Sequence, residues 1–401
     1  MRISAPEIVE NGSDLRVQAA VQYGDKQNLL WFSMDSRFRP YVTSEKLDGF
    51  LVGMLLLAMQ RGEDIHLDSP VSAKLYYSLQ NSYIRLLTLA IPSLTKITIV
   101  PSSLDYGISD SCQNEVVTGF SGGIDSFCVL ADHMSESVPT SHRITRLLFN
   151  NVGSHGEHNA EKGRVLFHQR YHMLSSYPRE LEMDFIQVDS NLSDLLQMNF
   201  QQTHVPRNAA PVLMLQKLFG RYLYASTYRY EDCYVGEAKD LAYMDPLGVH
   251  LLSTGTLDCV STGCEYSRVQ KTQRVSQFAG ARKYLNVCTS TEAEGRNCSK
   301  CLKCCRTLFT LELLDSLEYF QEVFDLETWK TVRGKYIVYV LGNQPNAFCR
   351  ELREYIKAED ISFPLSQRLA ATGFALANSV IGHLPANLKK TARRLGRIAL
   401  P

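Results

Sequence analysis

The sequence has neither a surplus of charge nor a hydrophobic run long enough to cross a bilayer. Its 401 residues include 42 basic and 42 acidic side chains, so the formal net charge is zero and no nucleic-acid partner is expected. The longest apolar runs, at 51–59 and 369–380, fall well short of the ~20 residues of a spanning helix. With no secretory signal at the start of the sequence, we expect a cytoplasmic protein without a membrane partner.

Two common nucleotide-binding motifs are missing as well. Neither GxxxxGK[ST] nor GxGxxG occurs, which excludes the Walker A loop and the dinucleotide fingerprint. There is no internal repeat and no low-complexity segment. A hydrophobic content of 45% and a charged content of 21% are typical of globular proteins, and the length predicts two or three domains.

Residues 1–112 predict an N-terminal accessory α/β domain. Alternating or short apolar segments predict strands at 15–23, 29–32 and 96–100, and longer apolar segments predict helices at 47–60 and 74–89. The Pro, Gly, Ser and Asp residues of 101–114 are typical of a domain boundary.

Residues 113–310 alternate strands with helices, which predicts a doubly wound parallel sheet. Residues 311–401 predict a mainly helical region with one strand at 336–340. The elements expected in the central part are strands beginning at 116 and at 146–150, 185–188 and 233–235, and helices from 127, at 165–175 and at 210–225.

A phosphate-binding loop is predicted between the first central strand and the helix that follows it. Residues 119–126 read GFSGGIDS. Gly122 and Gly123 allow positive φ and a close approach to phosphate, the helix N-terminus offers N–H donors, and Ser121 and Ser126 add hydroxyls. Asp125 would repel phosphate, so its expected role is to hold Mg²⁺. The alternative is a serine-capped turn without a ligand.

Five of the eleven cysteines are clustered, which predicts a metal site within 288–305. Cys288, Cys298, Cys301 and Cys304 form C-x9-C-x2-C-x2-C, a pattern that can close tetrahedrally on one Zn²⁺. Four protein ligands leave no position for water, so the site would be structural. The open alternatives are Cys305 as a ligand, an iron–sulfur cluster, a redox dithiol, or no metal.

The SGGIDS segment resembles the signature of the PP-loop ATP pyrophosphatases. The resemblance implies that ATP is cleaved between its α- and β-phosphates, and that the substrate is activated as an adenylate. Across residues 115–308 the chain further resembles 7-cyano-7-deazaguanine synthase of the queuosine pathway. This match is carried by SGGIDS, VPRN at 205–208, VGEAKDLAYMDP at 235–246, Arg268 with Lys271 before a short helix, and the four cysteines. The chain departs from the family in a shortened VPRN segment, in Ser299 where glycine is usual, and in its N- and C-terminal extensions.

The resemblance implies a reaction and a set of substrate residues. ATP would adenylate the carboxylate of 7-carboxy-7-deazaguanine, releasing pyrophosphate, and ammonia would attack to give an amide. A second ATP would drive dehydration of the amide to the nitrile. Related proteins with extra domains occur in anti-phage defence operons, where a protein amine can be the acceptor. Lys271 could pair with ATP phosphates, Arg207 and Asn208 could bind a phosphate or the purine-like edge, and Asp245 could accept from its N–H groups. The alternatives are an exposed helix lysine, a loop with a helix cap, and a turn before proline.

Several further interpretations stay open at this point. The chain could be another PP-loop enzyme, such as a tRNA thiolase or an amide synthetase, or a nucleotide-binding scaffold without activity. His155, Glu157 and His158 could form a second metal site, although a solvated loop is favoured. A basic segment in the tail could contact RNA or an acidic partner, or be a solvated face: Lys389, Lys390, Arg393, Arg394 and Arg397.

Overall fold

The computed structural model describes residues 1–108, 115–155, 160–288, 290, 296–343 and 346–383. They form two compact units. The first consists of Met1–Ser121 and Val129–Glu265, and the second of Gly122–Cys128 and the chain from Tyr266 onward. The helix α4 (Ile124–His133) begins in the second unit and ends in the first. The described strands lie in the first unit, and the second unit is helical. The chain as a whole therefore belongs to the α/β class that the sequence predicts.

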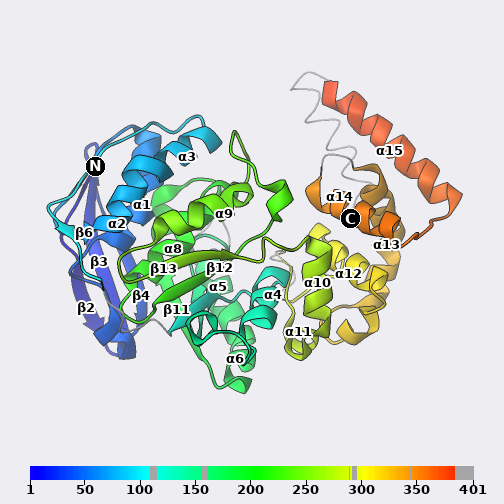
Figure 1. Ribbon diagram of the computed structural model, residues 1–401, viewed down its shortest axis with the longest axis horizontal. Coiled ribbons are helices and arrows are strands. Elements are labelled where there is room, and N and C mark those ends of the chain that lie inside the picture. Colours follow the sequence, from blue (N-terminus) through cyan, green and yellow to red (C-terminus); the bar gives the residue numbers. More distant parts are fainter. Residues whose placement is uncertain (109–114, 156–159, 289, 291–295, 344–345, 384–401) are drawn as a thin grey trace. The chain divides into compact units, whose positions relative to one another are not determined.

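The first unit is built on one 11-stranded sheet, counted over the described residues (Figure 1). Parallel pairing predominates. The strands along the sheet are β13 (Asp258–Thr262), β12 (Arg221–Ala225), β9 (Val116–Gly119), β10 (Arg146–Asn150), β11 (Asp184–Ser190), β4 (Lys26–Asp35), β3 (Asp14–Tyr23), β1 (Arg2–Ile3), β5 (Ile65–Leu67) and β7 (Ile99–Val100), with β2 (Glu7–Asn11) paired to β3. A separate pair joins β6 (Val71–Ser72) to β8 (Leu104–Asp105).

The five strands from β9 to β13 reverse their order within this sheet. The chain proceeds from β9 through β10 to β11 on one side, and then returns to β12 and β13 on the other side of β9. This is the arrangement of doubly wound sheets, in which ligands bind beyond the carboxyl ends of the strands at the point of reversal. That point lies between β9 and β12.

The N-terminal residues share the sheet with the central strands. β4 pairs antiparallel with β11, through Ser33 opposite Asp189 and Phe32 opposite Ser190. The helix α1 (Asp48–Arg61) packs closely on α8 (His204–Met214), because a Cβ on Gly49 would lie 2.8 Å from the carbonyl oxygen of Ala210. Residues 1–108 are therefore continuous with the structure that carries the phosphate-loop strand.

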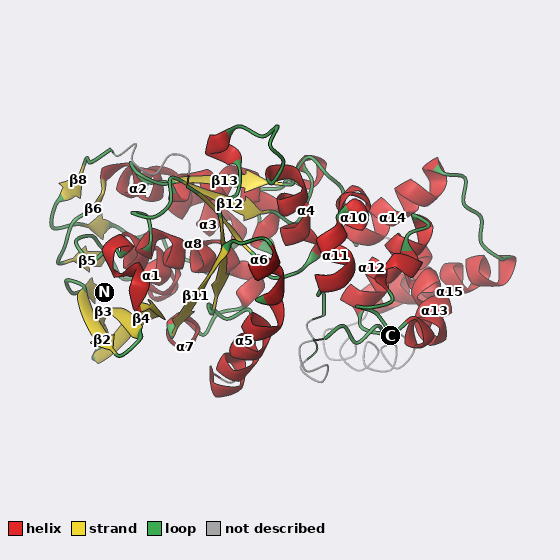
Figure 2. Ribbon diagram, turned by 90° about the horizontal axis from the view of Figure 1, so that it is seen from below, coloured by secondary structure: helices red, strands yellow, loops and turns green. Residues whose placement is uncertain are grey.

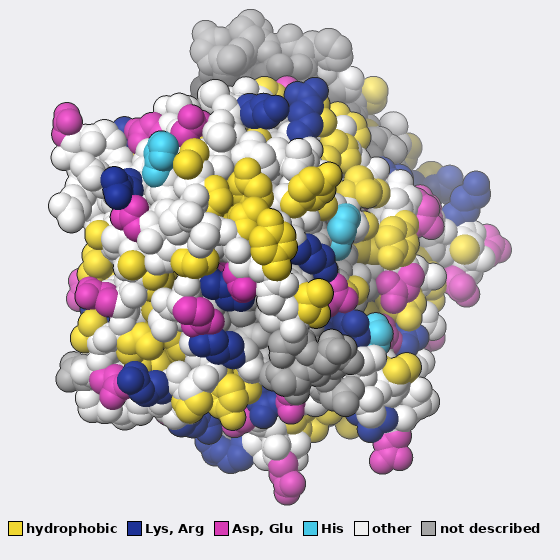
Figure 3. Space-filling model, turned by 60° about the vertical axis from the view of Figure 1, so that its left-hand side comes forward, with side chains coloured by type: hydrophobic (Ala, Val, Ile, Leu, Met, Phe, Trp, Pro, Cys, Tyr) yellow, Lys and Arg dark blue, Asp and Glu magenta, His cyan; other side chains and the backbone are white. Residues whose placement is uncertain are grey.

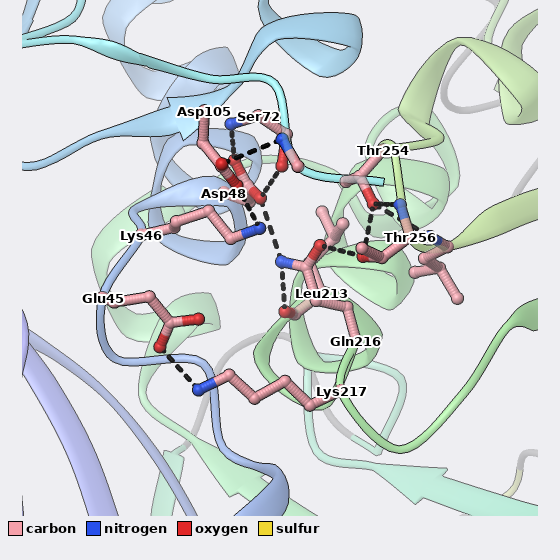
Figure 4. A network of polar contacts seen from close by, with 12 residues as sticks. Glu45, Lys46, Asp48, Ser72, Asp105, Leu213, Gln216, Lys217, Thr254 and Thr256 are labelled. Atoms are coloured by element: carbon pink, nitrogen blue, oxygen red, sulfur yellow. Dashed lines mark hydrogen bonds and ion pairs between the residues drawn. The ribbon is translucent and has the colours of Figure 1, made fainter. Parts of the chain in front are cut away.

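A buried polar network fixes this packing (Figure 4). The carboxylate of Asp48, which is fully buried, accepts hydrogen bonds from the backbone N–H and the hydroxyl of Ser72, at 2.8 and 2.6 Å, and from the Gln216 amide at 2.9 Å. The hydroxyl of Thr256 donates to the same Gln216 side chain at 3.1 Å. A buried carboxylate is tolerated when it is hydrogen-bonded in this way.

The remaining helices of the first unit cover the sheet, whereas every element that the structure describes after β13 is helical (Figure 2). Those of the first unit are α2 (Ala73–Ser78), α3 (Ile84–Ala90), α5 (Ala160–Leu174), α6 (Ser176–Glu180), α7 (Leu192–Leu196) and α9 (Asp245–Gly248). Those of the second unit are α10 (Arg268–Gln277), α11 (Ala279–Tyr284), α12 (Leu302–Leu313), α13 (Leu326–Gly342), α14 (Ala347–Ala358) and α15 (Leu365–His383). Within the described residues, no helix is both long and apolar enough to span a membrane.

Three sequence predictions of secondary structure are wrong. The helix expected at 210–225 ends at Met214, and β12 follows it after Gly220, where the alternating RYLYA pattern favours a strand. The strand expected at 233–235 is a loop. The strand expected at 336–340 lies inside α13, where buried packing overrides the strand propensity of YIVYV. The other central elements are confirmed within a few residues.

Candidate active site and metal centre

The predicted phosphate loop joins β9 to α4. β9 ends at Gly119 and α4 begins at Ile124, so the first N–H groups of a ten-residue helix follow the glycines directly. Gly122 has a φ of 73°, and of the two adjacent glycines it is the one that requires the left-handed region. Ser121 is exposed, while the buried Ser126 donates its hydroxyl to the carbonyl of Gly123 at 3.0 Å. The loop has the form that binds anions at a helix N-terminus.

Asp125, in the first turn of α4, is paired with two cations from α10. Its Oδ2 lies 2.9 Å from Nη2 of Arg268, and its Oδ1 lies 3.1 Å from Nζ of Lys271. Arg268 and Lys271 are buried, with 7% and 1% of their surface exposed. The two residues that the sequence assigned to catalysis, Asp125 and Lys271, are therefore in direct contact.

The two cations around Asp125 favour the ionised form of its carboxylate. Burial by itself would raise the pKa of Asp125, but the charges of Arg268 and Lys271, with their hydrogen bonds, hold that pKa below its usual range. The carboxylate of Glu351, which accepts the backbone N–H of Arg268, adds a second acidic group to the two cations and Asp125. Guanidinium and ammonium groups are also the side-chain donors that proteins use to bind phosphate.

The helix α10 presents both cations from one face. Arg268 and Lys271 are three residues apart, which places them on adjacent turns. They lie in the first turns of this helix, not before it as the sequence predicted. Ser267 and Gln270 form a capping box at its start, and the buried carboxylate of Glu351 from α14 accepts the N–H of Arg268 at 2.6 Å. Arg268 received no site role from the sequence, although its spacing to Lys271 was the available signal.

The four predicted metal ligands come together in the second unit. The sulfur atoms of Cys288, Cys298, Cys301 and Cys304 all lie within 4.8 Å of one another. Two pairs, Cys288 with Cys301 and Cys298 with Cys304, are each separated by 3.9 Å. Thiolates at ~2.3 Å from a tetrahedral zinc would be about 3.8 Å apart. The group could therefore hold a metal such as zinc.

The Asn297 side chain holds the segments that carry these cysteines. The Asn297 amide oxygen accepts from the backbone N–H groups of Val287 and Cys288, at 2.9 and 3.2 Å, and its nitrogen donates to the carbonyls of Leu285 and Val323. Next to this segment, the backbone N–H of Asn286 donates to the carbonyl of Gly122 at 2.7 Å. The cysteine site is thus linked to the phosphate loop through the segment 285–288.

Cys305 lies outside the group, as the spacing of the cysteines suggested. Its thiol is buried and donates to the carbonyl of Lys300 at 3.3 Å. Burial, together with the charges of Cys301 and Cys298, raises the pKa of Cys305 to about 12. Its place outside the group of four sulfur atoms is what separates Cys305 from the candidate ligands.

Ser299 adopts a backbone conformation that favours glycine. Its φ is 58°, in the left-handed region, and the residue is fully buried. Its hydroxyl oxygen accepts from the N–H of Asp325 at 2.9 Å, where α13 begins. This hydrogen bond offsets part of the conformational cost, which is ~1–2 kcal/mol for a residue with a side chain.

We expect Ser299→Ala to destabilise the protein by about 1–2 kcal/mol, because it keeps the unfavourable φ and leaves the Asp325 N–H without its acceptor. Ser299→Gly should be the more stable of the two variants, since it loses the same hydrogen bond but removes the conformational strain. Chemical denaturation of both metal-loaded variants tests this order. A Ser299→Ala variant as stable as Ser299→Gly would show that the strain is negligible.

Arg207 and Asn208 lie inside α8 and engage the protein itself. The Arg207 side chain is buried and donates to the carbonyls of Val152 and Met198, at 3.1 and 2.7 Å, and to the hydroxyl of Ser193 at 3.1 Å. The Asn208 amide donates to the carbonyl of His204 at 2.8 Å. These contacts give Arg207 a structural role, and its predicted substrate role stays a prediction.

Arg207→Lys should destabilise the first unit by about 2–4 kcal/mol, because a single ammonium group cannot reach the three acceptors that the guanidinium serves. Denaturant unfolding measures the change. Arg2→Lys is the control, since the Arg2 side chain is 66% exposed and a surface exchange of this kind stays within ~0.5 kcal/mol. Equal stability of the two variants would contradict the structural role.

Asp245, the third predicted substrate residue, is almost fully buried at the start of α9. Its negative charge, added to the effect of burial, raises the pKa values of Tyr83, Tyr222 and Tyr224. Tyr222 and Tyr224 are two residues apart on β12, so their side chains lie on the same face of the sheet. Asp245 therefore belongs to a group of polar side chains in the first unit that the sequence did not reveal.

His155 is buried, and the expectation of a solvated loop is wrong for this residue. Its ring packs against Phe149 and Phe167, and its Nε2 lies 3.3 Å from the carbonyl of Asn150. Burial, with the charge of Arg170, lowers the pKa of His155 to about 3. Glu157 and His158, the partners proposed for a second metal site, lie outside the described residues, as does the basic segment of the tail.

Basic and acidic side chains are interspersed on the face that Figure 3 displays, which agrees with the balanced charge of the chain.

Comparisons with protein-family models, with curated proteins and with solved structures found no match to this chain. The site therefore has to be interpreted from its own geometry.

Proposed function

We propose that this chain is an ATP-dependent synthase of the PP-loop type that activates a carboxylate as its adenylate. The observation that carries the proposal is the pairing of Asp125 with Lys271 and Arg268 directly after the SGGIDS glycines. A glycine loop, a helix N-terminus and two buried cations are the donors that a nucleotide triphosphate needs. The carboxylate of Asp125 would be a ligand for the divalent cation that accompanies the phosphates.

The residues at the phosphate loop and on α10 would have separate roles in the first step. The N–H groups at the start of α4 would orient the phosphates, and Lys271 and Arg268 would neutralise charge that develops on the leaving pyrophosphate. Asp125 would hold Mg²⁺, which supplies further charge neutralisation when bound. An oxygen of the substrate carboxylate forms a bond to the α-phosphorus, and the bond to the β-phosphate oxygen breaks with release of pyrophosphate.

The four cysteines support the proposal of a structural zinc site. Their sulfur separations fit tetrahedral coordination, and four protein ligands leave no position for a reacting water. Through the Asn286–Gly122 hydrogen bond, the site would hold the phosphate loop in shape. Zinc here would contribute folding free energy and no chemistry.

The substrate proposed from the resemblance is 7-carboxy-7-deazaguanine or a close relative. Its ring would carry N–H donors that suit the carboxylate of Asp245, and Arg207 and Asn208 would bind a phosphate or the purine-like edge. In the second step an amine attacks the adenylate and AMP leaves. Ammonia and a protein amine are both consistent acceptors.

Purified protein incubated with ATP, Mg²⁺ and 7-carboxy-7-deazaguanine, with and without ammonium, tests the proposal. Mass spectrometry should detect AMP, and a coupled assay should detect pyrophosphate, in amounts that depend on the deazapurine. Consumption that does not need ammonium would indicate a protein acceptor. The absence of deazapurine-dependent AMP would overturn the substrate assignment, and would leave another PP-loop substrate or a nucleotide-binding scaffold.

A further inference from the structure

The last described helix, α15, exposes a row of large apolar side chains. Leu365, Leu369, Leu376 and Val380 each have 64–67% of their surface exposed, and they form what we call the α15 row. At 3.6 residues per turn, the four side chains fall within an arc of about 60° on one side of the helix. Single exposed leucines are common on protein surfaces, but four along one helix face indicate a contact surface.

The opposite side of α15 is the side that packs within the second unit. Ala371 and Phe374 lie against α13, because a Cβ on Gly342 would be 2.6 Å from the carbonyl oxygen of Ala371 and 2.8 Å from Cδ1 of Phe374 (Figure 1). The rings of Phe374 and Tyr339 make an edge-to-face contact with centroids 6.1 Å apart. The packing of α15 on α13 therefore leaves the α15 row uncovered.

The α15 row is self-complementary about its midpoint. When two copies of α15 lie antiparallel, Leu365 faces Val380 of the second copy and Leu369 faces Leu376, because both pairs are centred on the same point of the helix. The reciprocal contacts follow by symmetry. A closed two-fold interface requires this property, in which residue i meets residue j and j meets i. The spacing of the row therefore suits a second copy of the same helix.

The residues around this midpoint also suit a close approach of two helices. Thr372 and Gly373 lie at the midpoint, and a Cβ on Gly373 would meet no atom of the described chain within 4 Å. The distance between two packed helices depends on the side chains at their crossing point, so small residues shorten it. In the sequence of α15, Arg368 is the only Lys, Arg, Asp or Glu. The two copies of Arg368 would lie ~13 Å apart along the pair, beyond the screening length of ~8 Å.

We propose that α15 is a dimerisation helix, and that two copies of this chain pair antiparallel along the α15 row about a two-fold axis. The proposal does not depend on the proposed function, because it involves neither the phosphate loop nor the cysteines. A second copy fits better than a partner of different sequence, since only a copy of α15 repeats the same spacing in the reverse direction. Two rows of this size form a small interface, so we expect a dissociation constant of the order of micromolar.

Sedimentation equilibrium of the full chain, over about 1–100 µM, tests the proposal. The wild type should change from monomer to dimer within this range. Leu369→Glu combined with Leu376→Glu should weaken the dimer by at least ~100-fold, because each carboxylate would face another across the axis. Leu369→Lys combined with Leu376→Glu should bind at least about tenfold more tightly than the double glutamate variant, since each lysine then faces a glutamate of the other copy. A parallel pair would bring like charges together in both variants.

Val165→Glu is the matched control, because Val165 is 52% exposed on α5 in the first unit and its substitution should leave the dimer unchanged. Far-ultraviolet circular dichroism checks the fold of every variant. A wild type that remains monomeric at about 100 µM, or a dimer that the two glutamates do not weaken, would overturn the proposal. So would a monomer that dimerises only after removal of residues 384–401, or a monomer that binds phosphatidylglycerol vesicles through the α15 row, because the occupant would then be the tail or a lipid surface.

Discussion

Asp125→Asn should lower the rate of pyrophosphate release by ~10²–10³-fold, the usual cost of removing one preorganised electrostatic group from an active site. Asparagine keeps the shape of the side chain but cannot balance the two cations, which lie at 2.9 and 3.1 Å from the carboxylate. It is also a much weaker ligand for Mg²⁺ than a carboxylate. A steady-state assay of pyrophosphate release against ATP and Mg²⁺ measures the effect.

Asp125→Asn should not weaken the binding of ATP, although it should slow the release of pyrophosphate. Removing the negative charge leaves Arg268 and Lys271 unbalanced, so Asp125→Asn should bind ATP without Mg²⁺ at least as tightly as wild type. Lys271→Met should instead weaken both binding and turnover. Asp132→Asn, on the same helix, is the control and should leave both unchanged. Weaker Mg²⁺-free ATP binding in Asp125→Asn would contradict the proposed division of roles.

Removal of the metal should unfold most of the second unit. Binding of a structural zinc ion contributes on the order of 10 kcal/mol, which is comparable to the whole stability of a domain. We therefore expect chelation, or Cys301→Ser, to abolish the cooperative thermal transition of this unit. ATP binding should be lost as well, because the Asn286–Gly122 hydrogen bond joins the cysteine segment to the phosphate loop.

Cys305→Ser is the matched control for the metal site. Its sulfur lies outside the group of four and donates to the Lys300 carbonyl, so the variant should bind one metal ion per chain, as the wild type should. Metal content by mass spectrometry and circular dichroism distinguish the two variants. Full metal binding by Cys301→Ser, with loss in Cys305→Ser, would mean that the ligand assignment is wrong.

The parts of the site that sequence reasoning recovered are those whose residues are close together in the chain. The phosphate loop was predicted from one contiguous segment, and the four cysteines within 288–305 were predicted from their spacing. Both rest on local chemistry, namely a glycine turn before a helix and thiols on tight turns.

The parts that it missed depend on contacts between distant residues. The contacts of His204 with Tyr224, at 2.6 Å, and with Asp240, at 3.3 Å, join a helix to a strand and a loop, and no spacing in the sequence relates these residues. The pairing of β4 with β11 across more than a hundred residues is likewise invisible to local patterns. The strand expected at 336–340 failed because burial against neighbouring helices, rather than residue propensity, decided the structure of YIVYV.

The central claim is that a substrate carboxylate attacks the α-phosphate of ATP. A direct test uses 7-carboxy-7-deazaguanine labelled with ¹⁸O in both carboxylate oxygens, together with ATP, Mg²⁺ and ammonium. The account predicts that one labelled oxygen appears in the phosphate of AMP and none in pyrophosphate. Label in inorganic phosphate with formation of ADP, or AMP without label, would contradict the formation of an adenylate.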